Sequence, residues 1–210
     1  MTPETEALIR SATRWSAVPF VPEVRLLTAA EPFALWDRTE RDAPPFWAFP
    51  WAGGQGLARY VLDHPGTVAG RRVLDIASGS GLVAIAAAKA GARTVLAGDI
   101  DENALAAVVL NAAANDAPAV TPRLVDLAAA GTGDAEVVLA ADVFYQRDMA
   151  ATALAFLREA RRGGAEVLVA DPGRAFVPAG DLSVLVTYEI PVLAVLEDAP
   201  VKQVTIYQLG

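Results

Sequence analysis

The amino-acid sequence predicts an α/β fold of three layers, in which one seven-stranded, mostly parallel sheet is covered by helices on both faces. From residue 71 onward, short apolar runs alternate with helix-forming segments, which is the pattern of βαβ units. One of these runs ends in a glycine-rich turn that leads directly into a helix. The last two runs have no helix between them, so they are expected to pair as an antiparallel hairpin at the C-terminus.

The composition favours one well-buried domain, because 54% of the 210 residues are hydrophobic. Cysteine is absent and His64 is the sole histidine, so we expect no disulfide, metal site or histidine-based catalytic triad. The net charge of −8 disfavours nucleic acid as a partner. Neither a signal peptide nor a membrane-spanning segment is expected. We therefore expect a cytoplasmic enzyme, with a monomer favoured and the oligomeric state left open.

The first part of the chain gives weaker signals. Thr2 is placed to cap a helix that begins at Pro3 and runs to about Ala12. Residues 18–24 contain two prolines and are expected to be irregular. Residues 25–28 are expected to form a short strand, and residues 32–37 a turn of helix.

Residues 44–56 are rich in proline, aromatic residues and glycine, and two of the four tryptophans lie here. We expect this segment to resist helix formation until a helical pattern begins at Leu57. It could form an aromatic lid over the edge of the sheet or line a cofactor site. Both roles are compatible, because a lid beside a binding site excludes water from it.

The regular part of the chain begins at Arg71. Helices are predicted at residues 82–90, 102–115 and 149–161. Strands are predicted at residues 72–76, 94–98, 120–125, 137–141, 166–170, 182–190 and 201–209. The last strand is expected to insert beside the strand at 166–170.

Residues 73–82, VLDIASGSGL, form the centre of the predicted site. Gly79 and Gly81 allow a sharp turn and the close approach of a ligand to the backbone. The amide groups at the start of the following helix would face that ligand. Asp75 precedes the glycines, and Asp99 ends the next strand, where a carboxylate can bind ribose hydroxyls. The segment therefore predicts a nucleotide or nucleoside site.

Four segments of the chain resemble the class I, seven-strand S-adenosylmethionine-dependent methyltransferases. They are VLDIASGSG at 73–81, PFWA at 45–48 with WAGGQ at 51–55, DVFY at 142–145, and DPGR at 171–174. Within that class, the resemblance is to the electron transfer flavoprotein β-subunit lysine methyltransferases, in bacteria often called nicotinamide N-methylase-like. It covers about residues 44–209. It implies a single methyltransferase domain, with a helical and aromatic lid segment at 1–70 and a Rossmann-like core at 71–210.

The resemblance also implies a set of site residues. Asp142 would hold the substrate amine, Phe144 and Tyr145 would surround the lysine stem, and Arg174 is a candidate for orienting a protein substrate. Ala77 stands where the family usually has glycine, but we expect cofactor binding to be retained. Asp126 would accept a hydrogen bond from the adenine amino group. The residues implicated in binding S-adenosylmethionine are Trp51, Gly53, Gly54, Gln55, Asp75, Ala77, Gly79, Gly81, Asp99, Ile100, Asp126 and Ala141.

The function that these residues predict is direct, in-line transfer of a methyl group to a lysine of a protein, with the flavoprotein β subunit as the expected substrate. Three other functions remain open at this stage. They are a small-molecule, nicotinamide-type N-methyltransferase, a cofactor-binding partner protein without turnover, and an NAD-dependent enzyme. A surface-open cavity at Asp142 would favour a protein substrate, and a closed one a small molecule. For Asp142 itself, the alternative role is the cap of the helix that follows it, with Phe144 and Tyr145 as ordinary core aromatics. The alternatives for Asp126 and Arg174 are a turn residue that ends a strand and a surface arginine.

Overall fold

The structure is a computed structural model that describes residues 2–29, 35–36, 44–178, 180–192 and 199–210. Its centre is a seven-stranded sheet of strand order β5-β4-β3-β6-β7-β9-β8. Strands β3 to β7 run parallel to one another, and β9 is antiparallel to both β7 and β8. The strands are β3 (Arg72–Ile76), β4 (Thr94–Asp99), β5 (Val120–Leu124), β6 (Val137–Ala141), β7 (Glu166–Asp171), β8 (Leu182–Pro191) and β9 (Val201–Leu209).

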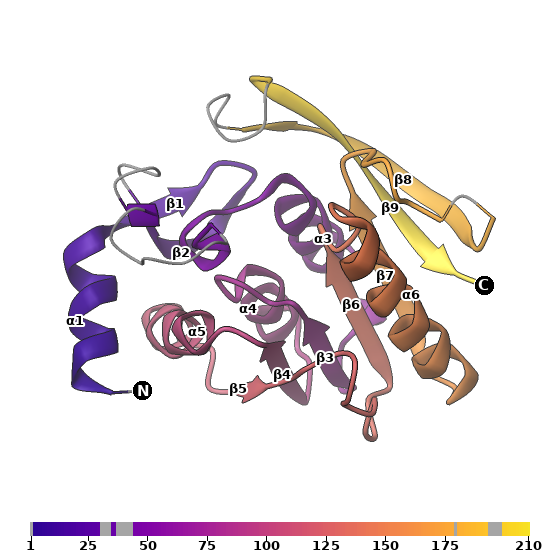
Figure 1. The fold of residues 1–210 in the computed structure, drawn as a ribbon, viewed down its shortest axis with the longest axis horizontal. Coiled ribbons are helices and arrows are strands. Elements are labelled where there is room, and N and C mark those ends of the chain that lie inside the picture. The colour runs from indigo at the N-terminus through magenta and orange to yellow at the C-terminus, as the bar shows by residue number, and fades with distance from the viewer. Residues whose placement is uncertain (1, 30–34, 37–43, 179, 193–198) are drawn as a thin grey trace.

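The sheet lies between helices (Figure 1) and separates two hydrophobic clusters. On one face, α3 (Ala52–Asp63), α4 (Leu82–Lys89) and α5 (Glu102–Ala114) pack on alternate strand residues such as Val73. On the other face, α6 (Arg147–Arg162) packs on their neighbours, such as Leu74. The predicted three-layer α/β architecture is confirmed, as is the insertion of the last strand beside β7.

From Arg71 onward, the predicted helices and strands lie within two residues of the observed ones at each end. The strands were recognisable because parallel strands buried on both faces consist of nearly continuous apolar residues. β6 is an example: its first four residues are all buried, and Asp142, which lines the cavity, follows it directly.

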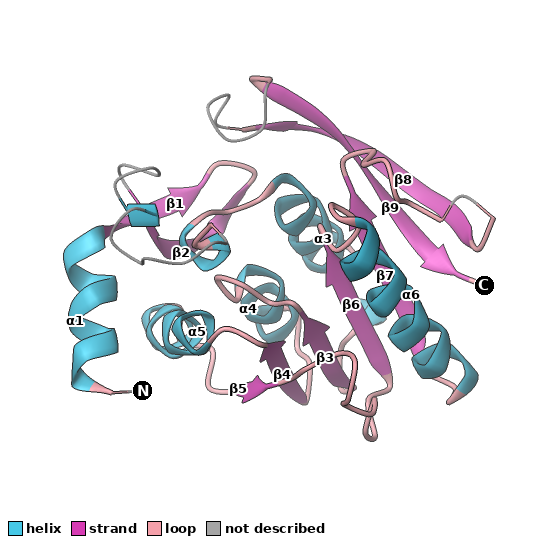
Figure 2. Cartoon of the chain, viewed as in Figure 1, coloured by secondary structure: helices cyan, strands magenta, loops and turns pink. Residues whose placement is uncertain are grey.

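The N-terminal segment differs from the prediction. Helix α1 (Pro3–Ala12) is capped by Thr2 as expected, but β1 (Thr13–Val18) and β2 (Val21–Ala29) follow it as an antiparallel hairpin (Figure 2). The expectation that residues 18–24 are irregular was therefore wrong. The two prolines of this segment lie in the turn and beside a shift in strand register. At these positions no backbone amide has to donate a hydrogen bond to the neighbouring strand. The helical turn expected at 32–37 falls mostly outside the described residues.

Two buried asparagines, one on α5 and one that forms its C-cap, fasten this hairpin to the core. Asn111 accepts a hydrogen bond from the Leu27 amide at 2.9 Å and donates one to the Ser80 carbonyl at 2.8 Å. Asn115 accepts from the Arg25 amide and donates to the Arg25 carbonyl. The hairpin is thus linked through Asn111 to the glycine-rich turn, although the two are far apart in the sequence.

Helix α3 begins at Ala52 rather than at Leu57, so the glycines that were expected to precede the helix are part of it. Close packing explains why a glycine-rich sequence is helical here. A Cβ atom on Gly56 would lie 2.7 Å from Val204 Cγ1 of β9, and one on Gly53 would lie 2.5 Å from Asp142 Oδ2. Glycine therefore lets α3 approach the sheet more closely than any larger residue would allow.

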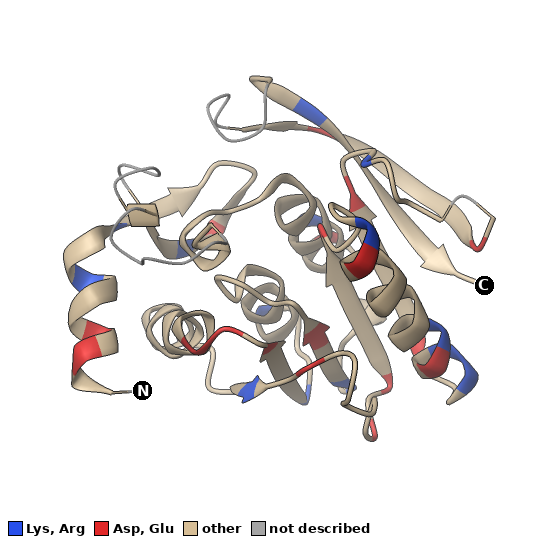
Figure 3. Cartoon of the chain, in the orientation of Figure 1, with Lys and Arg blue, Asp and Glu red and all other residues tan. Residues whose placement is uncertain are grey.

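Residues of opposite charge, blue and red in Figure 3, lie at the amino-terminal edge of the sheet, where they form ion pairs. Arg71 pairs with Glu166, while Arg72 and Arg93 both contact Glu136. These partly exposed pairs join the starts of neighbouring strands at the end away from the predicted site. Among the described residues, no helix combines the length and apolar character that crossing a bilayer requires.

Candidate functional site

A cavity of about 570 Å³ opens where the carboxyl ends of β3, β4 and β6 meet. Open α/β sheets bind their ligands at this edge. The aromatic segment before α3 forms one wall, and the glycine-rich turn forms the floor. The described residues that line it are Pro44, Pro45, Phe46, Trp47, Phe49, Trp51, Gly54, Asp75, Ala77, Ser78, Gly79, Ser80, Leu82, Val83, Asp99, Ile100, Asp101, Asn103, Ala104, Ala141, Asp142, Tyr145, Met149 and Arg174.

Two of the lining carboxylates bind the starts of helices that have no side-chain cap of their own. Helix α4 begins after Gly81, and Asp75 Oδ2 accepts a hydrogen bond from its third amide, Ala84, at 3.1 Å. Helix α3 begins after Trp51, and Asp142 Oδ2 accepts from its third amide, Gly54, at 2.9 Å. The positive ends of both helices therefore stabilise carboxylates that come from the sheet.

Asp99 shapes the glycine-rich turn. Its Oδ2 accepts a hydrogen bond from the Gly79 amide at 2.8 Å, and its Oδ1 accepts from the Asp101 amide at 3.0 Å. Burial raises the pKa of Asp99, while these amides act in the opposite direction. Burial also raises the pKa of Asp75 well above its ordinary value. Since a carboxylate can accept about four hydrogen bonds, Asp99 retains capacity for a ligand.

The neighbours of Asp99 complete one side of the cavity. Asp101 caps α5 by accepting from the Asn103 amide. Ile100 lines the cavity and is 68% exposed, an apolar surface with no protein cover. Asp126 does not line this cavity; it lies in an adjoining hollow that shares Ile100, and its side chain accepts from the Ala128 amide. The adenine contact of Asp126 remains a prediction.

The segment after β6 divides its side chains between the cavity and the core. Tyr145 is 41% exposed, lines the cavity and packs against Phe46 with ring centroids 5.4 Å apart. Phe144 is fully buried in the cluster beneath α6 and is not among the lining residues. The structure therefore brings Tyr145, but not Phe144, together with Asp142. Burial raises the pKa of Tyr145, so its hydroxyl keeps its proton at neutral pH.

Asp142 itself has a left-handed backbone conformation, with φ of 56°. Helix α6 starts at Arg147 with Gln146 as its N-cap, so the alternative in which Asp142 caps that helix is wrong. The helix that Asp142 does cap is α3, which lies before it in the sequence. An unfavourable conformation kept by a carboxylate in a cavity is typical of functional sites.

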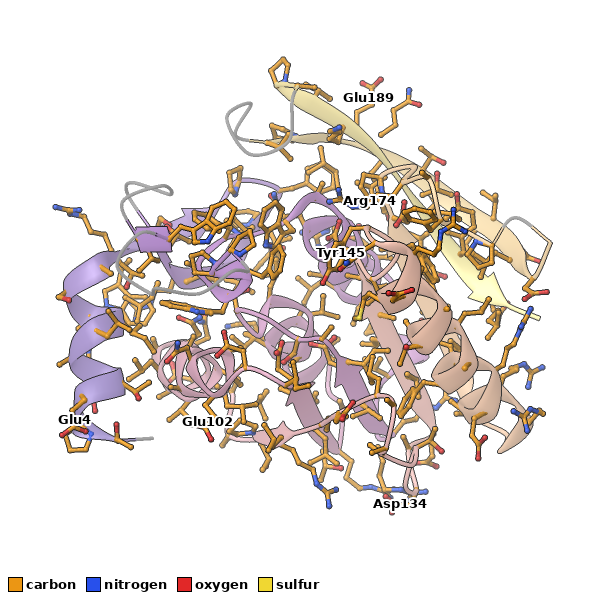
Figure 4. The ribbon with its side chains drawn as sticks, in the orientation of Figure 1. Glu4, Glu102, Asp134, Tyr145, Arg174 and Glu189 are labelled. Atoms are coloured by element: carbon orange, nitrogen blue, oxygen red, sulfur yellow. The ribbon has the colours of Figure 1, made fainter. Side chains whose placement is uncertain are left out.

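Arg174 brings a positive charge to this carboxylate. Its Nη2 lies 3.3 Å from Asp142 Oδ1, and its backbone amide donates to Asp171 Oδ1. Figure 4 shows Arg174 and Tyr145 at the same end of the molecule, while Asp134 lies at the opposite end of the sheet. The side chains of Arg174 and Asp142 are 28% and 13% exposed, so solvent reaches the pair.

Three of the residues implicated in cofactor binding do not line the cavity. They support the segments that do. Gln55 donates to the Pro50 carbonyl and accepts from the Phe20 amide, which fastens the aromatic segment. Gly53 leaves room for the Asp142 carboxylate. Gly81 adopts φ of 80° at the start of α4, close to Val108 of α5. Trp51 does line the cavity, and its indole donates to the Phe46 carbonyl.

Several lining residues were not singled out from the sequence, among them Phe46, Trp47, Ser78 and Met149. Ser78 and Trp47 stand out because Ser78 Oγ and Trp47 Nε1 are buried polar atoms without a hydrogen-bond partner in the described structure. The aromatic run and the glycine motif contain three of these residues, but neither pattern tells which side chains turn inward. Met149 gave no signal, because it lies on a helix whose face could not be oriented from the sequence.

Ala77 adopts a left-handed conformation, with φ of 49°, in the turn after β3. This conformation costs an L-residue about 1–2 kcal/mol, whereas glycine adopts it freely. We expect Ala77→Gly to raise the free energy of unfolding by about 0.5–1 kcal/mol, after the added unfolded-state entropy is subtracted. Urea unfolding measures this, with Ala151→Gly on the exposed face of α6 as a matched change that should destabilise. Equal destabilisation by both would contradict the strain at Ala77.

Comparisons with known proteins agree with this geometry. The family model of the ribosomal protein L11 methyltransferase (PrmA) matches residues 60–146. The electron transfer flavoprotein β-subunit lysine methyltransferase of Xenopus laevis is 37% identical over 173 residues, which are 80% of this chain and 70% of that protein. The human protein of that name is 36% identical over 180 residues, covering 83% and 68%.

Among solved structures, the fold is shared with magnesium protoporphyrin IX methyltransferase from Synechocystis, which contains S-adenosylhomocysteine. Its TM-score is 0.55 at 16% identity, with 75% of this chain and 82% of that chain covered. A tRNA (uracil-54, C5)-methyltransferase from Pyrococcus abyssi has a TM-score of 0.60 at 16% identity, covering 95% of this chain and 44% of that chain. At these identities the likeness concerns the fold.

Proposed function

The chain belongs to the electron transfer flavoprotein β-subunit lysine methyltransferase family, and we propose that its substrate is a lysine of such a β subunit. It is an S-adenosylmethionine-dependent protein-lysine methyltransferase. The observation that carries the substrate proposal is that Asp142 and Tyr145 line the same cavity as the glycine-rich turn. One cavity can therefore hold the methyl donor and the lysine amine together.

The cavity has the donors and acceptors that S-adenosylmethionine requires, and this cofactor supplies a methyl group carried on a positively charged sulfur. Asp99 has remaining acceptor capacity for the ribose hydroxyls, and the exposed side chain of Ile100 provides an apolar surface for adenine. The unsatisfied Ser78 Oγ and Trp47 Nε1 are donors suited to the anionic carboxylate of the amino-acid end. These matches support the assignment of Asp99 and Ile100.

The proposed role of Asp142 is to accept a hydrogen bond from the lysine amine and hold it toward the methyl donor. Alignment of this kind is the main contribution that a protein can make to an in-line displacement. Tyr145 and Phe46 offer aromatic faces, which attract the methylated, cationic product. Tyr145 does not act as the base, because its raised pKa keeps the hydroxyl protonated. The proton of the ammonium therefore leaves to solvent.

Exposure at the mouth of the cavity favours a protein over a small molecule as the acceptor. The partly exposed Tyr145 and Arg174 flank Asp142, so a lysine on the surface of another protein can reach the carboxylate. A nicotinamide-type acceptor would instead need to be enclosed. The half-exposed aromatic side chain at the mouth also suits a protein contact.

Mass spectrometry tests the proposal directly. The purified enzyme and S-adenosylmethionine are incubated separately with an electron transfer flavoprotein, with ribosomal protein L11 and with nicotinamide. We expect methyl groups on one or more lysines of the flavoprotein β subunit and much slower transfer to the other two acceptors. Preferential methylation of L11 or nicotinamide would reject the flavoprotein as substrate while leaving the methyltransferase activity established.

A further inference from the structure

Acidic side chains outnumber basic ones in the lining of the cavity. Among the described lining residues, Asp75, Asp99, Asp101 and Asp142 are acids, and Arg174 is the one cation. Arg174 contacts Asp142, the acid proposed to receive the substrate amine. Asp171, which is fully buried, anchors the Arg174 backbone through Oδ1. The guanidinium is thus fixed beside the carboxylate that the substrate lysine has to reach.

The position of Arg174 creates a chemical difficulty for a protonated lysine. A lysine ammonium at Asp142 would lie within a few ångströms of a guanidinium, which stays charged at all relevant pH values. Two like charges that share one carboxylate repel each other, so one of them is disfavoured. An uncharged amine avoids this repulsion and can still donate an N–H to Asp142 Oδ1 or Oδ2.

We propose that Arg174 is a positioning residue that makes the Asp142 carboxylate favour an uncharged lysine amine over a lysine ammonium. This inference rests on the proposed role of Asp142 as the amine-binding group. It gives the enzyme a way to obtain a nucleophile at neutral pH, where a free lysine is mostly protonated. The like charge promotes loss of a proton from the lysine ammonium to solvent water, and this loss frees the nitrogen lone pair that attacks the methyl group.

The rest of the cavity is consistent with this role. The tyrosine beside Asp142 keeps its own proton, because burial raises the pKa of Tyr145. Asp75 and Asp99 are engaged with the amides of Ala84 and Gly79, at the side where the adenosine is expected. The lone pair exposed by deprotonation forms the N–C bond while the C–S bond of the donor breaks, which leaves a neutral thioether and a methylated ammonium. No metal or redox partner is needed for that balance.

The test uses the full chain loaded with S-adenosylhomocysteine and n-butylamine as a probe of the lysine side chain. At pH 7 the probe is an ammonium, and we expect Arg174→Gln to bind it about tenfold more tightly than the wild type in NMR titrations. Adding Asp142→Asn to Arg174→Gln should remove that gain. Arg158→Gln is a matched control, because Arg158 also pairs with a carboxylate, Asp181, but on the exposed surface.

A second measurement follows the pH dependence of methyl transfer to a protein substrate. At pH 7 we expect Arg174→Gln to transfer the methyl group more slowly than the wild type. The rise of its rate with pH should occur about one pH unit higher than in the wild type. Arg174→Lys, which retains the charge, should keep the wild-type profile. Unchanged or weaker binding of n-butylamine to Arg174→Gln, or an equal rate loss at every pH, would overturn the inference. The binding of n-butylamine is measured without a flavoprotein, so its outcome does not depend on whether the flavoprotein is the substrate.

Discussion

Replacing Asp142 by asparagine should reduce the rate of methyl transfer by about a hundred- to a thousandfold while leaving cofactor affinity nearly intact. Asparagine keeps the size and one acceptor oxygen but loses the charge. That charge accepts a hydrogen bond from the Gly54 amide and pairs with Arg174. Asp142 follows β6, which β3 separates from β4, the strand that Asp99 ends. The lost interaction is of the preorganised electrostatic type, which is worth about 2.7–4 kcal/mol.

Single-turnover methylation measures this rate, and calorimetry with S-adenosylhomocysteine measures the affinity. Asp148→Asn is the matched control, because Asp148 lies in the exposed first turn of α6 and does not line the cavity. Near-normal turnover by Asp142→Asn would limit this residue to capping α3. A large loss of cofactor affinity would instead place the carboxylate against the cofactor. Thermal unfolding separates both results from a general loss of the fold.

The core of this fold is predictable because its strands carry their own signal. Strands β3, β6 and β7 are short apolar runs, and each is followed by the polar residues of the site. In contrast, the β1–β2 hairpin was missed because proline usually indicates irregular structure, whereas here it lies at the turn and the bulge. The prediction began helix α3 too late, because glycine disfavours a helix unless close packing offsets the cost.

The site is predictable only as far as local sequence determines it. The glycine-rich turn and the acid at the end of β4 come together because parallel strands end at one edge. Phe144 and Tyr145 are consecutive, and no local pattern shows that one enters the core and the other the cavity. The contacts of Asp142 with Gly54 and Arg174 join residues far apart in the chain. Such contacts depend on the packing of whole elements, so they had to be observed.

The link between the N-terminal hairpin and the cofactor side of the cavity is also a contact between residues far apart in the chain. Asn111 joins the Leu27 amide to the Ser80 carbonyl, so the position of the hairpin is coupled to the glycine-rich turn. A polar residue within a helix would ordinarily be expected at the surface. Here it is buried, because the oxygen and the nitrogen of its side-chain amide both have backbone partners.

The cofactor side of the cavity depends most on Asp99, and Asp99→Ala should weaken binding of S-adenosylmethionine by at least about a hundredfold. The change would remove the two charge-assisted hydrogen bonds that we propose between Asp99 and the ribose hydroxyls, each worth about 1.5–3 kcal/mol. It also leaves the Gly79 and Asp101 amides without their acceptor, which loosens the turn. Calorimetry measures the affinity, with Asp134→Ala at the far end of the sheet as the control.

The pH dependence of binding gives an independent check on Asp99. Burial raises the pKa of this carboxyl, and the ionised form is the better acceptor for ribose hydroxyls. Binding should therefore be strongest above that raised pKa and should weaken as the pH falls through it. In Asp99→Ala the same decline should be smaller, because the group that titrates is gone. An affinity that is unchanged in the variant, or that falls equally with pH in both proteins, would remove Asp99 from the cofactor site.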